Sequence, residues 1–348
     1  MECISVLKEL SVHTAVSGYE KSMADYIKES FGKDCDSVEE DRFYNVIGIK
    51  KGNKSNKKIM ITAHYDEIGF LVSGIDEKGF LRFTSVGGID PKILLAQEVI
   101  VHGRSDLLGI IGAKPPHLLK PEEAKKAVKM GELRIDMGMT PEKVREQVSI
   151  GDLITFKAVP FELQGKKLSS KTLDNRCGVT SLIEILKELR PFKFDSDIYV
   201  VATTQEEVGL TGVEIASYNL QPDIAIVIDA CHGDIPDAPK GEAYALGKGP
   251  AVAIGPNLHP KLTKKVIEIA KSENIPYQID IERGDTGTEA WATQVSRSGI
   301  PTILLSIPVR YMHTTVETVH ANDIENTAKL AARFIVKAET EMEELLCF

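Results

Sequence analysis

The 348-residue chain lacks the features that mark membrane and secreted proteins. No run of apolar residues approaches the length of about 18 that a transmembrane helix needs. The first residues, MECISVLKELSVH, include Glu2 and Glu9 and have neither a basic start nor a long apolar run, so a typical secretory signal is excluded. These absences predict a cytoplasmic protein without a membrane partner.

Cysteine motifs and excess basic charge are also absent. The five cysteines are odd in number and scattered, without a C-x-x-C pair, so the sequence indicates neither a disulfide framework nor a thiolate zinc site. Acidic residues number 51 against 42 lysines and arginines, and the formal charge of −9 argues against nucleic acid as a partner. The motifs H-E-x-x-H and G-x-S-x-G do not occur, so mononuclear zinc peptidases and serine hydrolases of those types lack their central residues.

The composition is that of an ordinary globular protein, 43% hydrophobic and 27% charged. The length suggests two domains, since a single core stops growing at about 250–300 residues. After residue 170, helical and strand patterns alternate, which predicts an α/β fold with a mostly parallel sheet sandwiched by helices. The expected elements are helix 177–190, strand 197–204, helix 212–218, strand 223–229, helix 260–273, strand 276–281, helix 287–298, strand 301–307 and helix 323–346.

The N-terminal part predicts elements that need a sheet to join. The segment from Ser17 to Glu20 is typical of a capping box and precedes an amphipathic helix over 18–31. Strands are expected at 43–50 and 57–63, and the lysine-rich segment between them predicts a solvated hairpin loop. The nearest sheet is the one that follows residue 170, so we expect both parts to form one discontinuous domain.

Between residues 69 and 165 the pattern changes to short apolar runs punctuated by glycine, aspartate and proline. Such runs, with brief helices near 121–130 and 141–148, predict a small inserted domain that resembles a β-barrel. We therefore expect a catalytic α/β domain of residues 1–68 and 166–348, and an inserted β-rich domain of residues 69–165.

Side chains able to bind metals end three of the predicted strand segments. KIMITAH ends in His64, DIYVVATTQEE ends in Glu206 and Glu207, and DIAIVID ends in Asp229. Ligands of an open α/β sheet bind beyond the carboxyl ends of its strands. We therefore expect these four side chains to meet at one edge of the sheet.

Two further candidates are His313, which follows strand 301–307, and Asp174, which precedes helix 177–190. Taken singly, Asp174 could cap its helix, Asp229 could begin a turn and His313 could be an ordinary half-buried histidine. Jointly, two histidines and three or four carboxylates without a cysteine fit a two-metal site for a zinc-, cobalt- or manganese-type ion.

Asp66 lies two residues after His64, a spacing that keeps both side chains on one face of an extended segment. Asp66 is suited to accept the imidazole N–H and to fix the ring tautomer. Cys177 and Cys231 lie close to candidate ligands in the sequence. Because a free cysteine is usually a small buried hydrophobic residue, we expect neither to bind metal.

Seven segments carry a further signal through their order and spacing. They are AHYDEIGF (63–70), KTLDNRCGV (171–179), TTQEEVGLTG (203–212), VIDA (227–230), GPNLHP (255–260), RGDTGTEAWA (283–292) and SIPVRYMHTTVE (306–317). Over essentially the whole chain, this set resembles the dinuclear metallo-aminopeptidases that form tetrahedral particles, a family that includes glutamyl and deblocking aminopeptidases. The resemblance implies a phosphorylase/hydrolase-like fold of the zinc-peptidase type.

The same resemblance implies two divalent ions per subunit, zinc or cobalt ahead of manganese. The implied ligands are Asp174 for both ions, His64 and Asp229 for one, and Glu207 and His313 for the other. Glu206 is implied to be the general base, free of metal and facing the water. Glu289 departs from the family pattern, in which aspartate is expected, and this concerns only the detail of that loop.

The leading hypothesis is a metal-dependent aminopeptidase that removes N-terminal residues from short peptides. The alternatives are an amidohydrolase or deacylase that uses the same ions, an endoglucanase-type glycoside hydrolase, and an assembly protein with a vestigial metal site. Glycoside hydrolysis needs two free carboxylates, so sensitivity to a chelator separates it from the aminopeptidase and from the amidohydrolase or deacylase.

The resemblance also implies a homo-oligomer, commonly a dodecamer built from dimers through the inserted domain. The preferred N-terminal residue stays open at this point. Arg283 and Arg310 could favour acidic side chains in a substrate pocket, or each could form a structural salt bridge.

Overall fold

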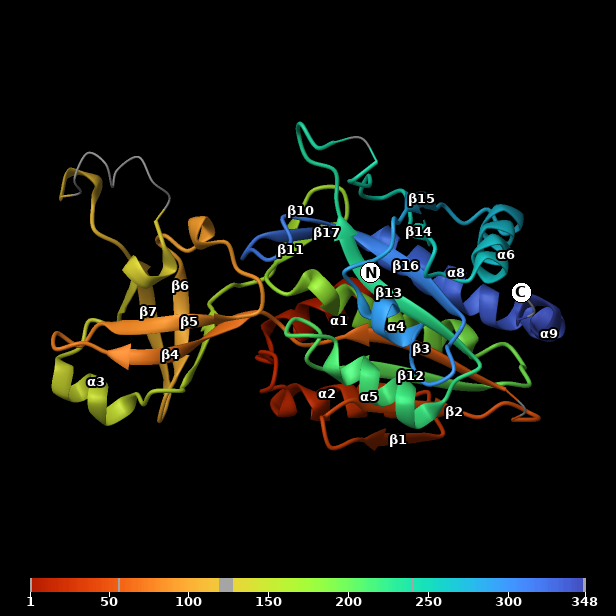
Figure 1. Cartoon of the computed structure of the whole chain (residues 1–348), viewed down its shortest axis with the longest axis horizontal. Helices are drawn as coiled ribbons and strands as arrows, with labels where there is room; N and C mark the ends of the chain where they lie inside the picture. Colours follow the sequence, from red (N-terminus) through yellow and green to blue (C-terminus); the bar gives the residue numbers. More distant parts are fainter. Residues whose placement is uncertain (1, 56, 119–127, 240, 347–348) are drawn as a thin grey trace.

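The computed structural model describes residues 2–55, 57–118, 128–239 and 241–346. Figure 1 shows a barrel-like unit at the left and a larger body of sheet and helices at the right, which contains both ends of the chain. Within the described ranges, no helix combines the length and apolar character required to cross a membrane.

The larger body is built on an eleven-stranded sheet. Its strands are β1 (Ser37–Glu40), β2 (Val46–Lys50), β3 (Lys58–His64), β10 (Phe161–Leu163), β11 (Lys167–Ser170), β12 (Asp197–Thr203), β13 (Ile224–His232), β14 (Ala251–Ile254), β15 (Gln278–Ile281), β16 (Thr302–Arg310) and β17 (Glu317–His320). The order is β1-β2-β12-β3-β13-β16-β17-β11-β10, and β14 joins β16 and carries β15. The central strands β12, β3, β13 and β16 are parallel, as expected. The marginal strands add antiparallel pairs.

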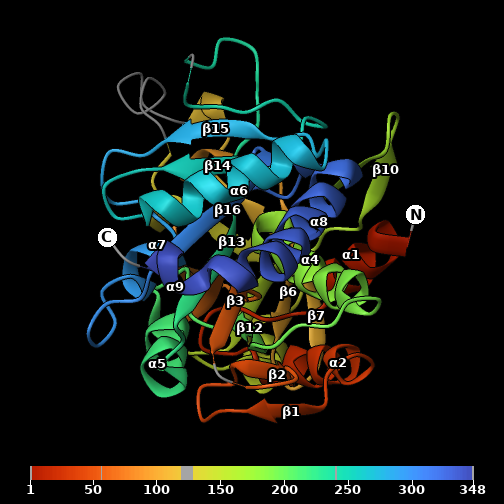
Figure 2. The same cartoon turned by 90° about the vertical axis from the view of Figure 1, so that its right-hand side faces the viewer.

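Helices cover both faces of this sheet. One face packs against α1 (Glu2–Val12), α2 (Lys21–Gly32), α4 (Leu173–Leu189), α6 (Pro260–Ser272), α8 (Ala321–Ala338) and α9 (Met342–Leu346), and the other against α5 (Thr211–Leu220) and α7 (Glu289–Thr293). Figure 2 shows α5 and α7 on one side of the strands and α1, α2 and α4 on the other. Ile59 and Ile61 of β3 face the first group, and Met60 faces α5, as the period of two in a strand requires. The predicted α/β sandwich is confirmed.

The smaller unit is a closed barrel of six strands with a hydrophobic core of its own. Its strands are β4 (Gly69–Ile75), β5 (Leu81–Val86), β6 (Glu98–His102), β7 (Asp106–Gly112), β8 (Arg134–Asp136) and β9 (Leu153–Phe156). In the core, the ring of Phe70 meets the rings of Phe83 and Phe156 edge to face, with both centroid distances 5.2 Å. The barrel-like insertion expected from the sequence is therefore present as a β-structure.

Short helices complete the barrel unit. They are η1 (Pro91–Ile93), η2 (Pro116–Leu118), η3 (Met130–Glu132) and α3 (Pro141–Gln147). The helix expected at 141–148 corresponds to α3. The helix expected near 121–130 falls mainly on residues 119–127, which lie outside the described residues, and Met130 begins a 3-10 turn.

The hairpin expected between 43–50 and 57–63 is wrong, because β12 lies between β2 and β3 in the sheet. Both strands are buried on both faces and need a neighbour on each edge. The described residues of the lysine-rich loop are largely exposed, as expected, and are tied to the start of β12. Asp197 accepts hydrogen bonds from Gly52 N (2.9 Å) and Ser55 Oγ (2.6 Å), and Lys51 Nζ lies 2.8 Å from its carboxylate.

The capping box at Ser17 is also wrong. The helix begins at Lys21 with Glu20 as its N-cap residue, and Ser17 Oγ donates a 2.5 Å hydrogen bond to Asp66 instead. A tertiary partner has displaced the local one. The final helix is divided as well, because a 3-10 turn, η4 (Glu339–Glu341), separates α8 from α9. The helix expected at 287–298 is limited to α7.

Candidate metal centre

Six of the candidate site residues come together at the carboxyl edge of the parallel strands. β3 ends at His64 and β13 carries Asp229 near its end. Glu206 and Glu207 follow β12 by a few residues, and the turn after β16 supplies His313. Asp174 enters from the first turn of α4, where its backbone is not helical. The arrangement follows from the topology, because parallel neighbouring strands end at one edge.

The side chains form two adjoining clusters. The atoms offered by His64, Glu206 and Asp229 all lie within 4.8 Å of one another, and so do those of Asp174, Glu207 and His313.

Asp174 lies between the two imidazoles. Its Oδ1 is 3.4 Å from His64 Nε2, and its Oδ2 is 3.4 Å from His313 Nε2. Asp229 Oδ1 lies 3.6 Å from the first imidazole, and Glu207 Oε1 lies 3.2 Å from the second. One carboxylate therefore faces both clusters, and each imidazole has a second carboxylate beside it.

The electrostatics of the clusters call for positive charge. Hydrogen bonds to Asp174 and Glu207 raise the pKa of His313 to about 11. Burial raises the pKa of Glu206 to about 9, and the charges of Asp229 and Glu207 add to this shift while His64 opposes it. Burial also raises the pKa of Glu207 and of Asp229, whereas at Asp174 burial is outweighed by hydrogen bonds from His313 and His64, which lower the pKa. A divalent cation would relieve the same excess of negative charge.

The donor atoms also fit divalent cations chemically. Asp229 Oδ2 is buried, and no hydrogen-bond donor reaches it within the described parts of the chain. Imidazole nitrogens and carboxylate oxygens are the ligands of zinc, cobalt and manganese. Neither cluster contains a thiol, and the Sγ of buried Cys177 faces the Asn175 side chain at 3.9 Å.

Asp66 connects more elements than its spacing predicts. Its Oδ1 lies 3.4 Å from His64 Nδ1, without hydrogen-bond geometry. Its carboxylate accepts hydrogen bonds from the backbone N–H groups of Glu206 (3.1 Å) and Glu207 (3.2 Å), and from Ser17 Oγ. Asp66 therefore fixes the backbone of the paired glutamates and stands beside the imidazole of His64.

Two contacts to the metal-binding candidates were not anticipated from the sequence. Buried Glu317 accepts hydrogen bonds from the backbone N–H groups of Asp174 (3.0 Å) and His313 (2.7 Å). The carbonyl of Gly88, in the loop after β5 of the barrel, accepts a 2.7 Å hydrogen bond from His313 Nδ1. This bond directs Nε2 of His313 toward the carboxylates. The available signal for Glu317 was its place as the last residue of the segment SIPVRYMHTTVE, and Gly88 had none.

A cluster of buried charged side chains connects the site to the N-terminal helix. Glu67 pairs with Lys171 and with Arg176, whose Nη2 lies 3.1 Å from Glu67 Oε1. Arg176 also donates hydrogen bonds to the carbonyls of Leu10 (2.5 Å) and His13 (2.6 Å). The end of α1 is thereby joined to the start of α4, which carries Asp174.

Comparison with known proteins identifies the family. The sequence profile of the M42 glutamyl aminopeptidases matches residues 44–330. The chain belongs to the M42 glutamyl aminopeptidase family. As a member, it is an aminopeptidase and a hydrolase, and membership of this metallopeptidase family implies divalent metal ions.

Relatives of this M42 aminopeptidase match it over nearly their full length. A lysyl aminopeptidase of Pyrococcus furiosus is 35% identical over 94% of each chain. An aminopeptidase structure from Desulfurococcus kamchatkensis has a TM-score of 0.93 and 37% identity, covering 100% of this chain and 98% of that one. A Pyrococcus horikoshii TET1 peptidase, described as assembling into a tetrahedron or an octahedral shell, has a TM-score of 0.83, 34% identity and coverage of 96% and 99%. The family expected from the seven segments is confirmed.

The remaining site candidates take structural positions in this M42 aminopeptidase. Arg310 forms an ion pair with Asp234, with Nη2 2.6 Å from Oδ1. Glu289 is buried and accepts a hydrogen bond from Thr203 Oγ1. Arg283 lines a pocket beside the metal centre.

Proposed function

We propose that this M42 aminopeptidase binds two divalent ions and removes N-terminal residues from short peptides. His64 and Asp229 would hold one ion, Glu207 and His313 the other, and Asp174 both. The observation that carries the proposal is the position of Asp174, whose two oxygens each lie 3.4 Å from a different imidazole. Bound ions supply Lewis acidity that polarises the scissile carbonyl and acidifies a water molecule.

Glu206 is the proposed general base. Its Oε2 lies 4.0 Å from His64 Nε2, and burial raises its pKa, which favours the protonated form that gives a proton to the leaving amine. In the proposed reaction Glu206 accepts a proton from water and delivers it to the leaving amine. Asp66 contributes by holding the Glu206 and Glu207 backbone and by standing beside His64.

The proposed ions are zinc or cobalt, with manganese as a further candidate. A donor set of imidazole and carboxylate without thiolate suits all three. The test is to strip the metal, confirm loss of hydrolysis of aminoacyl-chromogenic substrates, and add each ion back separately. Recovery with one of these ions supports the proposal, and glucan hydrolysis that survives a chelator would favour a glycoside hydrolase. Cleavage of N-acylated but not free peptides would favour a deacylase.

We also propose that the chain forms a homo-oligomer, a dodecamer built through the barrel. The domain limits expected from the sequence are 69–165 for the inserted unit and 1–68 with 166–348 for the catalytic unit, but β10 (Phe161–Leu163) pairs with β11 and so belongs to the sheet of the larger body. The assembly of the TET1 relative supports it, and so does the outer face of β7, where Leu108 and Ile110 are half exposed. Light scattering tests this proposal: a mass of twelve chains supports it, and a monomer overturns it.

A further inference from the structure

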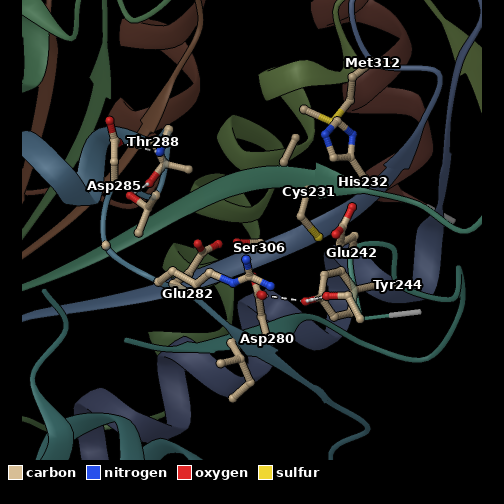
Figure 3. A pocket seen from close by; sticks show the side chains of 17 residues that line it. Cys231, His232, Glu242, Tyr244, Asp280, Glu282, Asp285, Thr288, Ser306 and Met312 are labelled. Atoms are coloured by element: carbon tan, nitrogen blue, oxygen red, sulfur yellow. Dashed lines mark hydrogen bonds between the residues drawn. The ribbon is translucent and has the colours of Figure 1, made fainter. Parts of the chain in front are cut away.

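A large pocket adjoins the proposed metal centre. Its cavity has a volume of about 700 Å³. Ala230 and Met312, which line it, are the chain neighbours of the proposed ligands Asp229 and His313. The opposite wall comes from the edge strand β15 and the loop that follows it. Figure 3 shows the pocket with Met312 at its upper end and Asp280 at its lower end.

The lining of the pocket is acidic. Four carboxylates border it, from Glu242, Asp280, Glu282 and Asp285, against one arginine, Arg283. Arg283 is exposed and makes no ion pair with Asp280 or Glu282, and no other cation of the described residues does so. The pocket therefore carries negative charge that no ion pair among the described residues neutralises.

Asp280 is the most deeply placed of these carboxylates. Only 6% of it is exposed, and its Oδ1 accepts a 2.5 Å hydrogen bond from Tyr244 Oη, drawn dashed in Figure 3. Burial, followed by the charge of Asp280 and a hydrogen bond to it, raises the pKa of Glu282 to about 7. Asp280 is buried and Glu282 is half-buried, and two neighbouring carboxyl groups without a cation are costly unless a ligand supplies the positive charge.

Apolar residues line the pocket together with the carboxylates. Met312, Tyr244 and Ala230 belong to the same lining. A hydrocarbon stem with a cationic head matches this combination of surfaces, as in lysine and arginine. An acidic side chain would meet like charges, and a neutral chain would desolvate the carboxylates without pairing them.

We propose that this pocket receives the N-terminal side chain of the substrate and that Asp280 and Glu282 select lysine or arginine. The inference rests on the proposed function, since it assigns a preference to the same hydrolytic site. It also excludes one of the two roles considered for Arg283, the selection of acidic side chains.

The first test compares substrates on the metal-loaded protein. The kcat/KM values are measured for chromogenic amides of lysine, arginine, norleucine, leucine and glutamate. Lysine and arginine should exceed glutamate by about 10²-fold or more, because a buried carboxylate is left facing the wrong charge. Norleucine has the lysine stem without the ammonium, so its ratio to lysine isolates the charge contact.

The second test removes the charges with little change in shape. Asp280→Asn and Glu282→Gln should each reduce the lysine to norleucine ratio of kcat/KM by about tenfold, and the double variant should reduce it further. Glu268→Gln removes one carboxylate from the exposed side of α6 and should leave the ratio unchanged. Calorimetry with lysinamide and norleucinamide gives a readout that does not need turnover, and the difference in Kd should shrink in the same variants.

The outcomes separate this inference from the proposed function. Hydrolysis of none of the five amides would overturn the aminopeptidase proposal. Hydrolysis with a preference for glutamate, or with an unchanged ratio in both the Asp280 and Glu282 variants, would overturn the inference and leave the aminopeptidase proposal standing. If Asp280→Asn does not fold because the hydrogen bond to Tyr244 is lost, the lysine to norleucine ratio of Glu282→Gln still tests the inference.

Discussion

The barrel and the α/β body differ in what they bury. Among the described residues from 69 to 156, Thr155 is the one polar side chain that is buried, whereas the body buries Asp66, Glu67, Arg176 and Glu317 around the metal centre. A buried charge lowers stability unless it is paired and hydrogen-bonded. In the described residues, buried charged side chains therefore lie in the unit that carries the metal centre, while the barrel interior is filled by apolar side chains.

The two units nevertheless meet at one functional contact. The carbonyl of Gly88 in the barrel unit bonds to His313 Nδ1 in the body. Thr315 Oγ1 adds a 3.3 Å hydrogen bond to Gln97 of the barrel unit. Among the residues that the structure describes, the barrel unit supplies no member of the two clusters, but it orients His313, which the body supplies.

The largest effect is expected in the body, at the neighbouring glutamates Glu206 and Glu207, which follow β12. Glu206→Gln should leave both ions bound and lower turnover by about 10²–10⁴-fold, the usual contribution of a general base. Glu207→Gln should instead lose metal, because a neutral amide is a weak ligand. Bound metal and kcat are measured for both variants. If only the Glu206 variant loses metal, Glu206 is the ligand and Glu207 the general base. If turnover is unchanged in both variants, neither glutamate acts in the active site.

In the barrel, the expected effect is on stability alone. Phe70→Ala removes a fully buried ring that packs on two others, and should lower the free energy of unfolding of the barrel by about 3–5 kcal/mol. Calorimetry should show a separate early transition, while metal content at low temperature stays full. Phe161→Ala, at a half-exposed ring of β10, is the matched control and should change little. Loss of metal from the folded Phe70 variant would show that the two units are coupled more tightly than the comparison implies.

A smaller effect is expected at Glu317, which bonds to the backbones of two proposed ligands. Glu317→Gln keeps one acceptor oxygen but places an amide donor against the second N–H group. Metal affinity should fall by about 10–100-fold, the usual range for groups that orient ligands. Glu39→Gln on exposed β1 should leave affinity unchanged. Equal affinities for the Glu317 variant and the parent protein would limit Glu317 to a packing role.

The smallest effect concerns a buried carboxylate of the body that is remote from the ligands. Burial raises the pKa of Asp323 to about 6, although Gly247 N (2.6 Å) and Gly249 N (2.7 Å) donate to it. Since the folded pKa exceeds the ordinary value of 3.8, this group favours folding most below pH 4, and stability is lost as the pH rises through 6.

Asp323→Asn removes this titration. It also loses one acceptor oxygen, so its gain over the parent protein at pH 8 should be only about 1 kcal/mol. Thermal unfolding between pH 4 and 8 measures the difference, and parallel curves for the two proteins would contradict the assignment.

The fold was predictable where burial alone decides it. The runs that became β12 and β13 are apolar along nearly their whole length, as strands covered on both faces must be, and their polar ends met at one edge. The sequence was misleading where a contact with a residue far away in the chain determines the local structure. Ser17 has a suitable spacing for a cap but bonds to Asp66, and β12 separates two strands that are neighbours in the chain.

The site residues that end buried strands were predictable from the sequence. The site residues that act through contacts with distant parts of the chain were not. His64 and Asp229 follow directly from strand ends, which local pattern reveals. Gly88 and Glu317 act through backbone groups of residues far away in the sequence, and no spacing rule connects them to His313 or Asp174. Such contacts are fixed by tertiary packing, so a single sequence carries no periodic trace of them.

The hydrogen bonds of Glu317 also bear on how the protein is made. Glu317 joins Asp174 to His313 and follows both in the sequence, so a ribosome must pass residue 317 before these bonds can form. The described barrel strands end at Phe156 and can pair while later segments are still being added. The backbone contacts that hold Asp174 and His313 therefore form after the barrel strands have been synthesised.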